Sequence, residues 1–373
     1  MRTAYRTCPF CEATCGLEIT LDGDRVERVR GDAEDVFSHG FLCPKGVALK
    51  AFHEDPERLR VPMGKQPDGT HAEASWDEAF ALIAERLPAI QAEHGRDAVG
   101  IYLGNPSVHS VAGQLYGKVL VKALQSRNVF SASTVDQFPK QAACAHMFGG
   151  GLSVPIPDLD RTDYLLMLGA NPAASNGSLM TAPDARGRIA AISARGGKVV
   201  VVDPRRTRSA KLADEHVWIR PGTDALMLFA LVHVLFDEGL ATPVDHLEGV
   251  ETVAALARDF TPEAAEGPTG IPADALRRLA RELAAAPTAA VYGRIGTTTQ
   301  EFGTVASWLI DVLNALTGNL DRPGGAMWPL PATSKRGTGS GRGARFGRWT
   351  SRVRGAGEIF GELPVACLAE EIE

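Results

Sequence analysis

The sequence predicts an α/β fold, and three observations support that prediction. Apolar segments of strand length alternate with segments of helical spacing, most clearly between residues 164 and 204. Hydrophobic residues make up 45% of the 373-residue chain, which is enough to build a sizeable core over two or three domains. The net charge is −6, and this acidic balance argues against a protein built around a basic nucleic-acid surface.

The chain lacks the signals that would place it in or across a membrane. No apolar run reaches the ~18 residues needed to cross a bilayer, and the N-terminus shows neither an apolar leader nor a twin-arginine pair. We therefore expect a cytoplasmic protein with no transmembrane segment. In that compartment its six cysteines should be free, metal-bound or catalytic rather than paired in disulfides.

The first part of the chain predicts a small β-rich region followed by helices. Residues 17–30 alternate apolar and polar side chains around a turn, which is typical of a β-hairpin. Residues 53–62 are rich in proline and charge and indicate a boundary. Helical spacing predicts helices over 77–92 and 111–124, with a short buried strand over 98–103 between them.

The clearest element pattern follows. Residues 164–169 and 198–204 are apolar strands, and residues 181–196 between them form a helix that ends at a glycine. A strand, helix and strand within about 40 residues predict a βαβ crossover, and hence a parallel sheet covered by helices. Further apolar elements are expected at 223–238, 272–285, 288–293 and 303–317.

Three loops of this region fit a ligand site, because open parallel sheets bind ligands outside the carboxyl ends of their strands. They begin at Gly169, Asp203 and Arg220. Glycines allow the backbone to approach a pyrophosphate, carboxylates of Asp203 and Asp224 suit sugar hydroxyls or guanine edges, and Arg205 suits a phosphate. The alternative is that these are ordinary turns. None matches G-x-G-x-x-G, so a nicotinamide site is not indicated.

The cysteines predict a metal centre near the N-terminus. Cys8, Cys11 and Cys15 have the spacing C-x2-C-x3-C, and Cys43 follows 27 residues later. Three clustered thiolates with one remote thiolate suit an iron–sulfur cubane, whereas zinc sites usually show two separate pairs. A structural zinc remains the alternative reading of the spacing.

The segments CPFCEATCGLEI and GFLCPKG resemble the N-terminus of the molybdopterin oxidoreductases that carry a bis-(molybdopterin guanine dinucleotide) cofactor, such as formate dehydrogenases and nitrate reductases. The resemblance implies that Cys8, Cys11, Cys15 and Cys43 hold a [4Fe-4S] cluster. It also implies that Lys45 lies on the electron path between cluster and pterin. The cofactors implied are therefore this cluster and molybdenum, or tungsten, on the bis-pterin.

The resemblance continues along the chain to about residue 330, through GANPAASN, VVDPRRT, RPGTDAL, YGRIGTTTQ and TGNLDRPGG in that order. It implies a set of cofactor-binding residues in these segments. They are Gly169, Asn171, Ser175, Asp203, Pro204, Arg205, Thr207, Gly222, Asp224, Gly293 and Gly296.

By the same resemblance, the fold is a small β-rich [4Fe-4S] domain followed by interleaved open-sheet, Rossmann-like α/β domains. The expected boundaries are 1–55 for the cluster domain, 56–127 for the first α/β segment and 128–330 for the dinucleotide-binding domain. Residues 331–373 would form a basic loop, over 334–355, and a truncated return toward the first α/β domain. From the resemblance we also expect the C-terminal domain that caps the cofactor in this family to be missing.

At the position where this family usually has a cysteine or selenocysteine that ligates the metal, this chain has neither. Counting back from the strand at 164 places it near Thr134, Val135 or Asp136. Asp136 is the best local candidate, because a carboxylate oxygen suits a hard, high-valent metal. Cys144 is the other candidate, although a lone cysteine among alanines is typical of a core residue.

The resemblance implies an oxidoreductase that exchanges an oxygen atom or a hydride equivalent with a small-molecule substrate. Electrons would pass between the metal and the [4Fe-4S] cluster, and a ferredoxin-like partner or a quinone-linked subunit would exchange them. Two alternatives stay open. One is a non-catalytic iron–sulfur electron-transfer subunit of the same fold, and the other is a structural or regulatory protein with zinc in the four cysteines.

Overall fold

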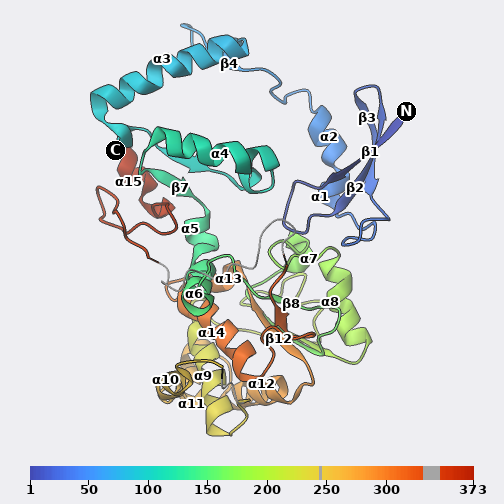
Figure 1. Cartoon of the computed structure of the whole chain (residues 1–373). Helices are drawn as coiled ribbons and strands as arrows, with labels where there is room; N and C mark the ends of the chain where they lie inside the picture. The colour runs from blue at the N-terminus through green and yellow to red at the C-terminus, as the bar shows by residue number, and fades with distance from the viewer. Residues whose placement is uncertain (243–245, 331–344) are drawn as a thin grey trace. The chain divides into compact units, whose positions relative to one another are not determined.

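The computed structural model describes residues 1–242, 246–330 and 345–373 (Figure 1). Much of the basic segment expected as a loop over 334–355 therefore lies outside the described residues. The rest of the chain divides into two compact units, one formed by Met1–Thr134 with Phe346–Glu373 and the other by Val135–Arg345. Both contain helices and strands, which confirms the predicted α/β class.

The first unit begins with an antiparallel sheet. Its strands are β1 (Arg2–Thr7), β2 (Gly16–Asp22) and β3 (Arg25–Gly31), in the order β1-β2-β3. The predicted hairpin is confirmed as β2 and β3, and it turns at Gly23, whose φ of +58° suits a glycine. The short helices α1 (Pro44–Val47) and α2 (Leu49–Glu54) follow.

Two longer helices and a small parallel sheet form the rest of the first unit. Helix α3 (Trp76–His94) begins with a capping box, in which the side chains of Ser75 and Glu78 each bind the other's backbone N–H. Helix α4 (Val111–Leu124) matches its predicted bounds. The remaining elements are β4 (Met63–Lys65), β5 (His71–Glu73), η1 (Arg96–Ala98), β6 (Ile101–Leu103), η2 (Asn105–Val108), β7 (Val129–Ser131), η3 (Val365–Cys367) and α15 (Leu368–Ile372).

The strand predicted over 98–103 is shorter and less buried than expected. It spans only Ile101–Leu103, because residues 96–98 form a 3₁₀ turn. Tyr102 is 56% exposed. Among the described residues, β6 pairs with a single strand, β7, so this small sheet buries little of it. The prediction of a buried strand here was therefore wrong.

The second unit is built on a parallel sheet in the order β11-β10-β9-β12. The strands are β9 (Tyr164–Leu168), β10 (Lys198–Val202), β11 (Glu215–Val217) and β12 (Ala289–Gly293). Strand β9 pairs in register with β10 on one side and β12 on the other, all parallel. This arrangement confirms the predicted βαβ crossover.

Helix α8 (Ala185–Ala194) of this crossover begins four residues later than predicted. Residues Leu179, Thr181 and Asp184 adopt positive φ values, which a helix does not allow. The side chain of Asp184 instead accepts a hydrogen bond from the N–H of Gly187 at 3.1 Å and caps the helix.

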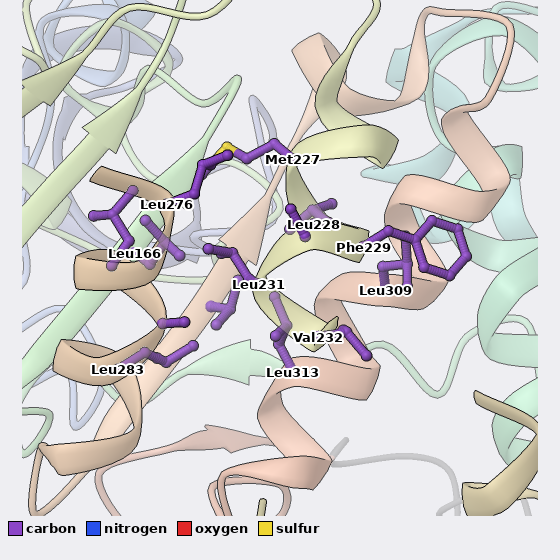
Figure 2. Close-up of a cluster of buried hydrophobic side chains, with 14 of the residues drawn as sticks. Leu166, Met227, Leu228, Phe229, Leu231, Val232, Leu276, Leu283, Leu309 and Leu313 are labelled. Atoms are coloured by element: carbon purple, nitrogen blue, oxygen red, sulfur yellow. The ribbon is translucent and has the colours of Figure 1, made fainter. Parts of the chain in front are cut away.

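Alternate residues of the central strands enter two hydrophobic cores. Leu166 and Leu168 pack with α9 (Asp224–Asp237), α12 (Ala273–Ala285) and α14 (Gly303–Leu316) in the larger core (Figure 2). Leu165 and Met167 pack with α8 in the smaller core on the other face. The period-2 alternation of the strand side chains explains why both faces of the sheet are covered by helices.

Further elements complete the second unit. They are α5 (Ser133–Asp136, which begins in the first unit), α6 (Phe138–Phe148), β8 (Ile156–Pro157), α7 (Pro172–Ser175), α10 (Val250–Ala257), α11 (Pro262–Thr269), α13 (Ile295–Thr298) and β13 (Ala326–Met327). Of the helices in the described ranges, none combines the length and apolarity that crossing a bilayer requires.

A network of charged side chains joins the amino ends of the strands to α12. The Lys198 ammonium lies 3.0 Å from Glu215 and 2.8 Å from Glu282. The Arg278 guanidinium also contacts both carboxylates, and the Tyr164 hydroxyl donates to Glu282 at 3.2 Å. This edge of the sheet is therefore closed by ion pairs, which leaves the opposite, carboxyl edge for a ligand.

Candidate functional site

The four N-terminal cysteines lie on one compact loop and the turn that follows β3. The N–H of Cys8 donates to the carbonyl of Cys15 at 2.8 Å, which closes the loop between β1 and β2. Cys43 is the residue before α1, and Pro44 fixes the start of that helix. Cys8, Cys15 and Cys43 are buried, Cys11 is half-buried, and none of the four forms a disulfide.

The electrostatics of these thiols show that they face one another. Burial, together with the negative charges that Cys8, Cys11 and Cys43 would carry, raises the pKa of Cys15 to about 11. Burial likewise raises the pKa values of Cys8 and Cys11. Four thiolates in this space therefore require a cationic group to neutralise them.

The four thiols form a loose group. Among the described residues, no three His, Cys, Asp or Glu side chains form a group that could hold one metal ion. The charges of Cys8, Cys11 and Cys43 nevertheless contribute to the raised pKa of Cys15, so the four side chains lie in one neighbourhood. Four cysteine thiolates are the ligand set of a [4Fe-4S] cluster.

Lys45 lies beside this centre. It is exposed on α1, two residues after Cys43. Its positive charge lowers the pKa of Cys11 against the dominant effect of burial. The ammonium group is thus near enough to the thiols to favour their charged form.

The second predicted site lies at the carboxyl edge of the parallel sheet, where the loops after β9 and β12 approach closely. The N–H of Gly296 donates to the carbonyl of Gly169 at 3.0 Å. A Cβ atom on Gly169 would lie 2.7 Å from the Cα of Gly296, and the φ of Gly169 is +53°. Only glycine fits both positions without displacing backbone.

The loops after β9 and β10 are tied together by polar side chains. The carbonyl oxygen of the Asn171 side chain accepts hydrogen bonds from the N–H and hydroxyl of Ser209, at 3.2 and 2.9 Å. Asp203 accepts from the N–H of Arg205 at 2.8 Å across a turn whose tip is the exposed Pro204. The Arg205 side chain is exposed and able to reach a ligand phosphate.

Two other predicted residues of these loops shape the backbone. Thr207 is buried, and its hydroxyl accepts from the N–H of Ala210 at 3.1 Å. Ser175 ends the short helix α7. The Thr207 side chain therefore stabilises the turn that follows Asp203, and Ser175 lies in the short helix that follows Asn171.

A buried carboxylate closes the site on the β11 side. Asp224 begins α9, and burial raises its pKa, with the charge of Asp203 acting in the same direction. Its Oδ2 accepts from the side chain of Gln300 at 2.9 Å. The Oε1 of Gln300 is buried without a hydrogen bond among the described residues and lies 4.0 Å from where a Cβ of Gly222 would be.

This arrangement fits a bound nucleotide base and pyrophosphate. The orphaned Gln300 oxygen is an acceptor that a donor on a base would satisfy, and the close Gly169–Gly296 approach keeps the backbone of the two loops free of side chains at this edge. Gln300 was not predicted as an individual site residue. The run Thr-Thr-Thr-Gln after a buried strand was the signal that could have identified it.

Gly293 differs from the other predicted glycines. It lies at the end of β12, and a Cβ there would meet Ile310 at 2.2 Å and Thr297 at 2.8 Å. The protein itself covers this position, so Gly293 serves the packing of α14 on the sheet.

The two candidate metal ligands lie in different environments. Asp136 ends α5, is half-buried, and its carbonyl accepts from the Thr298 hydroxyl at 2.5 Å. Cys144 is fully buried between α6 and α14, and burial raises its pKa to about 12. Burial disfavours the thiolate form that a cysteine ligand needs, whereas Asp136 is only half-buried at the end of its helix.

Family models match nearly the whole chain. One described as the molybdopterin oxidoreductase Fe4S4 domain matches residues 1–54, and one described as molybdopterin oxidoreductase matches residues 58–346. The first contains the four cysteines, and the second contains all the predicted cofactor-binding residues.

Several curated proteins are similar to this chain. It is 30% identical to formate dehydrogenase H of Escherichia coli over 339 residues. The aligned region covers 88% of this chain and 46% of the relative. It is 30% identical over 352 residues to a nitrate reductase of Symbiobacterium thermophilum, with 88% and 45% covered. It is 32% identical over 331 residues to the thiosulfate reductase molybdopterin-containing subunit PhsA of Salmonella typhimurium, with 85% and 41% covered.

The fold is also similar to that of a solved structure. Acetylene hydratase from Pelobacter acetylenicus superposes with a TM-score of 0.71 at 23% identity, over 84% of this chain and 43% of the other. The chain thus spans less than half the length of the proteins it matches. From the two family models and these relatives, we conclude that the chain belongs to the molybdopterin oxidoreductase family.

Proposed function

We propose that this chain binds a [4Fe-4S] cluster and a molybdenum- or tungsten-bis-(molybdopterin guanine dinucleotide), and that it passes electrons between them in an oxidoreductase. The observation that carries the proposal is that the loops after four parallel strands meet at one edge of the sheet. Gly169 and Gly296 approach closely there, and Asp224 is hydrogen-bonded to Gln300. When bound, the cofactor supplies a redox metal able to exchange an oxygen atom or hydride equivalent with a small substrate.

The residues of the carboxyl edge would bind and orient the dinucleotide. Asp224 and Gln300 together offer two acceptor oxygens, which suit the N–H groups of a guanine. The glycines at 169 and 296 let backbone approach the pyrophosphate, and Arg205 supplies a positive charge at the exposed rim. Asn171 and Ser209 hold the two loops at a fixed separation.

At the N-terminus, Cys8, Cys11, Cys15 and Cys43 would hold the cluster, and Lys45 would place a positive charge on its electron path. The raised pKa values of Cys8, Cys11 and Cys15 support a metal group here, because buried thiolates need a cation to neutralise them. Asp136 is the side chain we assign to the metal of the second cofactor.

The substrate is proposed to be a small molecule. The similar proteins carry names that refer to formate, nitrate and thiosulfate, and none of these is specific to this chain. A ferredoxin-like protein or a quinone-linked subunit is the proposed redox partner.

Pterin analysis of the anaerobically purified chain tests the proposal. Iodine oxidation should release a fluorescent pterin, and hydrolysis should release GMP in matching amount. The variant Gly169→Ala should lose the pterin while retaining iron, because its new Cβ would collide with Gly296.

Gly196→Ala is the matched control. Gly196 also has a positive φ, of +90°, but nothing lies within 4 Å of where its Cβ would be. It should keep its pterin. Iron without pterin in the unmodified chain would favour an iron–sulfur electron-transfer subunit instead, and zinc without iron would favour a structural or regulatory protein.

A further inference from the structure

A histidine ring faces the loop that carries the first three cysteines. The side chain of His109 is only 9% exposed, and its Nε2 lies 3.9 Å from Glu12 Oε1, within ion-pair distance. Both residues belong to the first unit. Among the described residues, this Nε2 is buried and forms no hydrogen bond. The Glu12 carboxylate is therefore the charged partner that the structure gives to the ring nitrogen.

The backbone on both sides of His109 is held at the start of α4. Ser110 caps that helix, and its hydroxyl accepts from the N–H of Gly113 at 3.2 Å. The Gln114 side chain donates to the carbonyl of Val108. These two contacts fix the residues before and after His109, and so they position its ring.

Glu12 directly follows Cys11 on the loop between β1 and β2. The N–H of Thr14 donates to the carbonyl of Cys11 at 3.2 Å, so Glu12 lies within a tight turn that begins at a predicted cluster ligand. Its side chain is half-buried. Burial raises the pKa of Cys11, and the negative charge of Glu12 acts in the same direction. Glu12 is thus a negative charge beside the predicted cluster.

The packing of the fold does not explain a ring nitrogen at position 109. A buried polar atom without a hydrogen bond costs free energy, and an apolar side chain would avoid that cost. The ring does suit the charge of Glu12, because a hydrogen on Nε2 presents a positive end to the carboxylate. A bare ring nitrogen would be repelled by the carboxylate, so the hydrogen belongs on Nε2.

We propose that His109 is a positioning residue for the cluster, which holds the Glu12 carboxylate, offsets its negative charge and thereby raises the reduction potential of the cluster. This inference rests on the proposed function for the presence of the cluster, and on the described contact for the way the charge is offset. Reduction adds one electron, which comes from the second cofactor or from the redox partner, and no bond at His109 or Glu12 forms or breaks. Negative neighbours oppose the added electron, because the potential of such a cluster depends on the charges and hydrogen bonds around it.

A redox titration of the anaerobically purified full chain, followed by the electron paramagnetic resonance of the reduced cluster, tests this role. In His109→Leu, which removes the ring nitrogens, the ratio of reduced to oxidised cluster at a fixed applied potential should fall about three- to tenfold. Tenfold corresponds to a shift of about 59 mV to lower potential for a one-electron couple. His109→Gln should recover much of the wild-type value, because its amide N–H can face Glu12.

The variant Glu12→Gln separates the effect of charge from the effect of structure. It should raise the potential, because it removes the negative charge. Adding His109→Leu to Glu12→Gln should give no further shift, since no charge is left to offset. Equal shifts from His109→Leu in both backgrounds would overturn the proposal. An unchanged potential in Glu12→Gln would also overturn it, even where His109→Leu binds no iron.

His94→Leu is the matched control. His94 Nε2 lies 3.5 Å from Glu93 Oε1, so these residues form a second histidine–glutamate pair. Their side chains are 60% and 74% exposed, and neither residue belongs to the loop of the cysteines. The control should keep the wild-type potential, and a shift as large as that of His109→Leu would contradict the role assigned to Glu12.

The failure of this inference can be told apart from failure of the proposed function. A wild-type chain that binds no iron overturns both. If iron is present and His109→Leu titrates as wild type does, the role of His109 fails and the proposed function stands.

Discussion

At the scale of single residues, three thiols of the N-terminal centre resist ionisation. Burial and mutual repulsion hold the pKa values of Cys8, Cys11 and Cys15 above the ordinary thiol range. Near neutral pH these side chains stay protonated until a metal group binds them. Cluster binding must therefore release protons, and it stabilises the small domain that surrounds it.

We expect Cys43→Ala to lose the cluster. Cys43 supplies the one ligand from outside the loop at residues 8–15, and without it the coordination is incomplete. Iron content and the visible absorbance should both fall to background. Cys367→Ala removes an equally buried thiol far along the sequence and should keep its iron. Unchanged iron in Cys43→Ala would remove this residue from the ligand set.

Individual site residues differ in how well the sequence predicts them. Gly169, Asp203 and Asp224 could be found because each follows a strand or begins a helix in a recognisable pattern. Gln300 ends the Thr-Thr-Thr-Gln run after a buried strand, but that run alone does not show its contact with Asp224, 76 residues away in the sequence. Contacts between distant segments become visible only in the folded chain.

At the scale of elements, the charged network at the amino edge of the sheet should stabilise the larger unit in a pH-dependent way. Burial raises the pKa values of Glu215 and Glu282, but hydrogen bonds from Arg278 and Lys198 outweigh it and leave both values lowered. A lowered carboxyl pKa adds stability above the unfolded-state pKa, and this stability is lost as the pH falls through the folded-state pKa.

The variant Arg278→Met should therefore cost about 1 kcal/mol of unfolding free energy near neutral pH, since it removes contacts to both carboxylates. The difference from wild type should shrink as the pH falls below about 4, where the carboxylates of both proteins become protonated. Denaturant unfolding at several pH values measures this difference in unfolding free energy.

Arg281→Met is the control for this network. The more exposed Arg281 forms an ion pair with the one carboxylate of Glu238, so its loss should cost less than about 0.5 kcal/mol. A cost for Arg278→Met that does not change with pH would contradict the electrostatic account.

Elements with strong periodicity were predictable, and those defined by pairing were not. The strands at 164–168 and 198–202 are continuous apolar runs, so their parallel pairing followed from the helix between them. Strand β11 has only three residues, Glu215–Val217, and it is a strand because it pairs with β10. Helix α8 starts late because its first predicted turn adopts left-handed backbone conformations.

At the scale of the whole molecule, the smaller α/β region exposes large apolar side chains. Phe80 on α3 is 61% exposed and Leu115 on α4 is 63% exposed, with Trp76, Ile83, Tyr116 and Val119 similarly exposed. Contiguous apolar surface of this kind drives association in water. We therefore expect the chain to self-associate as its concentration rises.

The double variant Phe80→Glu with Leu115→Glu should shift that association to higher concentration, as measured by sedimentation velocity. Its iron content should not change. Lys118→Glu on α4 is the matched control, because it makes the same total change of net charge without removing apolar surface. Equal effects of the two variants would assign the association to charge rather than to the apolar faces.

The most direct test of the central claim is an elemental analysis of the anaerobically purified chain for iron, molybdenum, tungsten and zinc. We predict about four iron atoms per chain, as a cubane requires, together with molybdenum or tungsten. Iron without either metal would contradict the binding of the second cofactor. Zinc in place of iron would contradict the redox function as a whole.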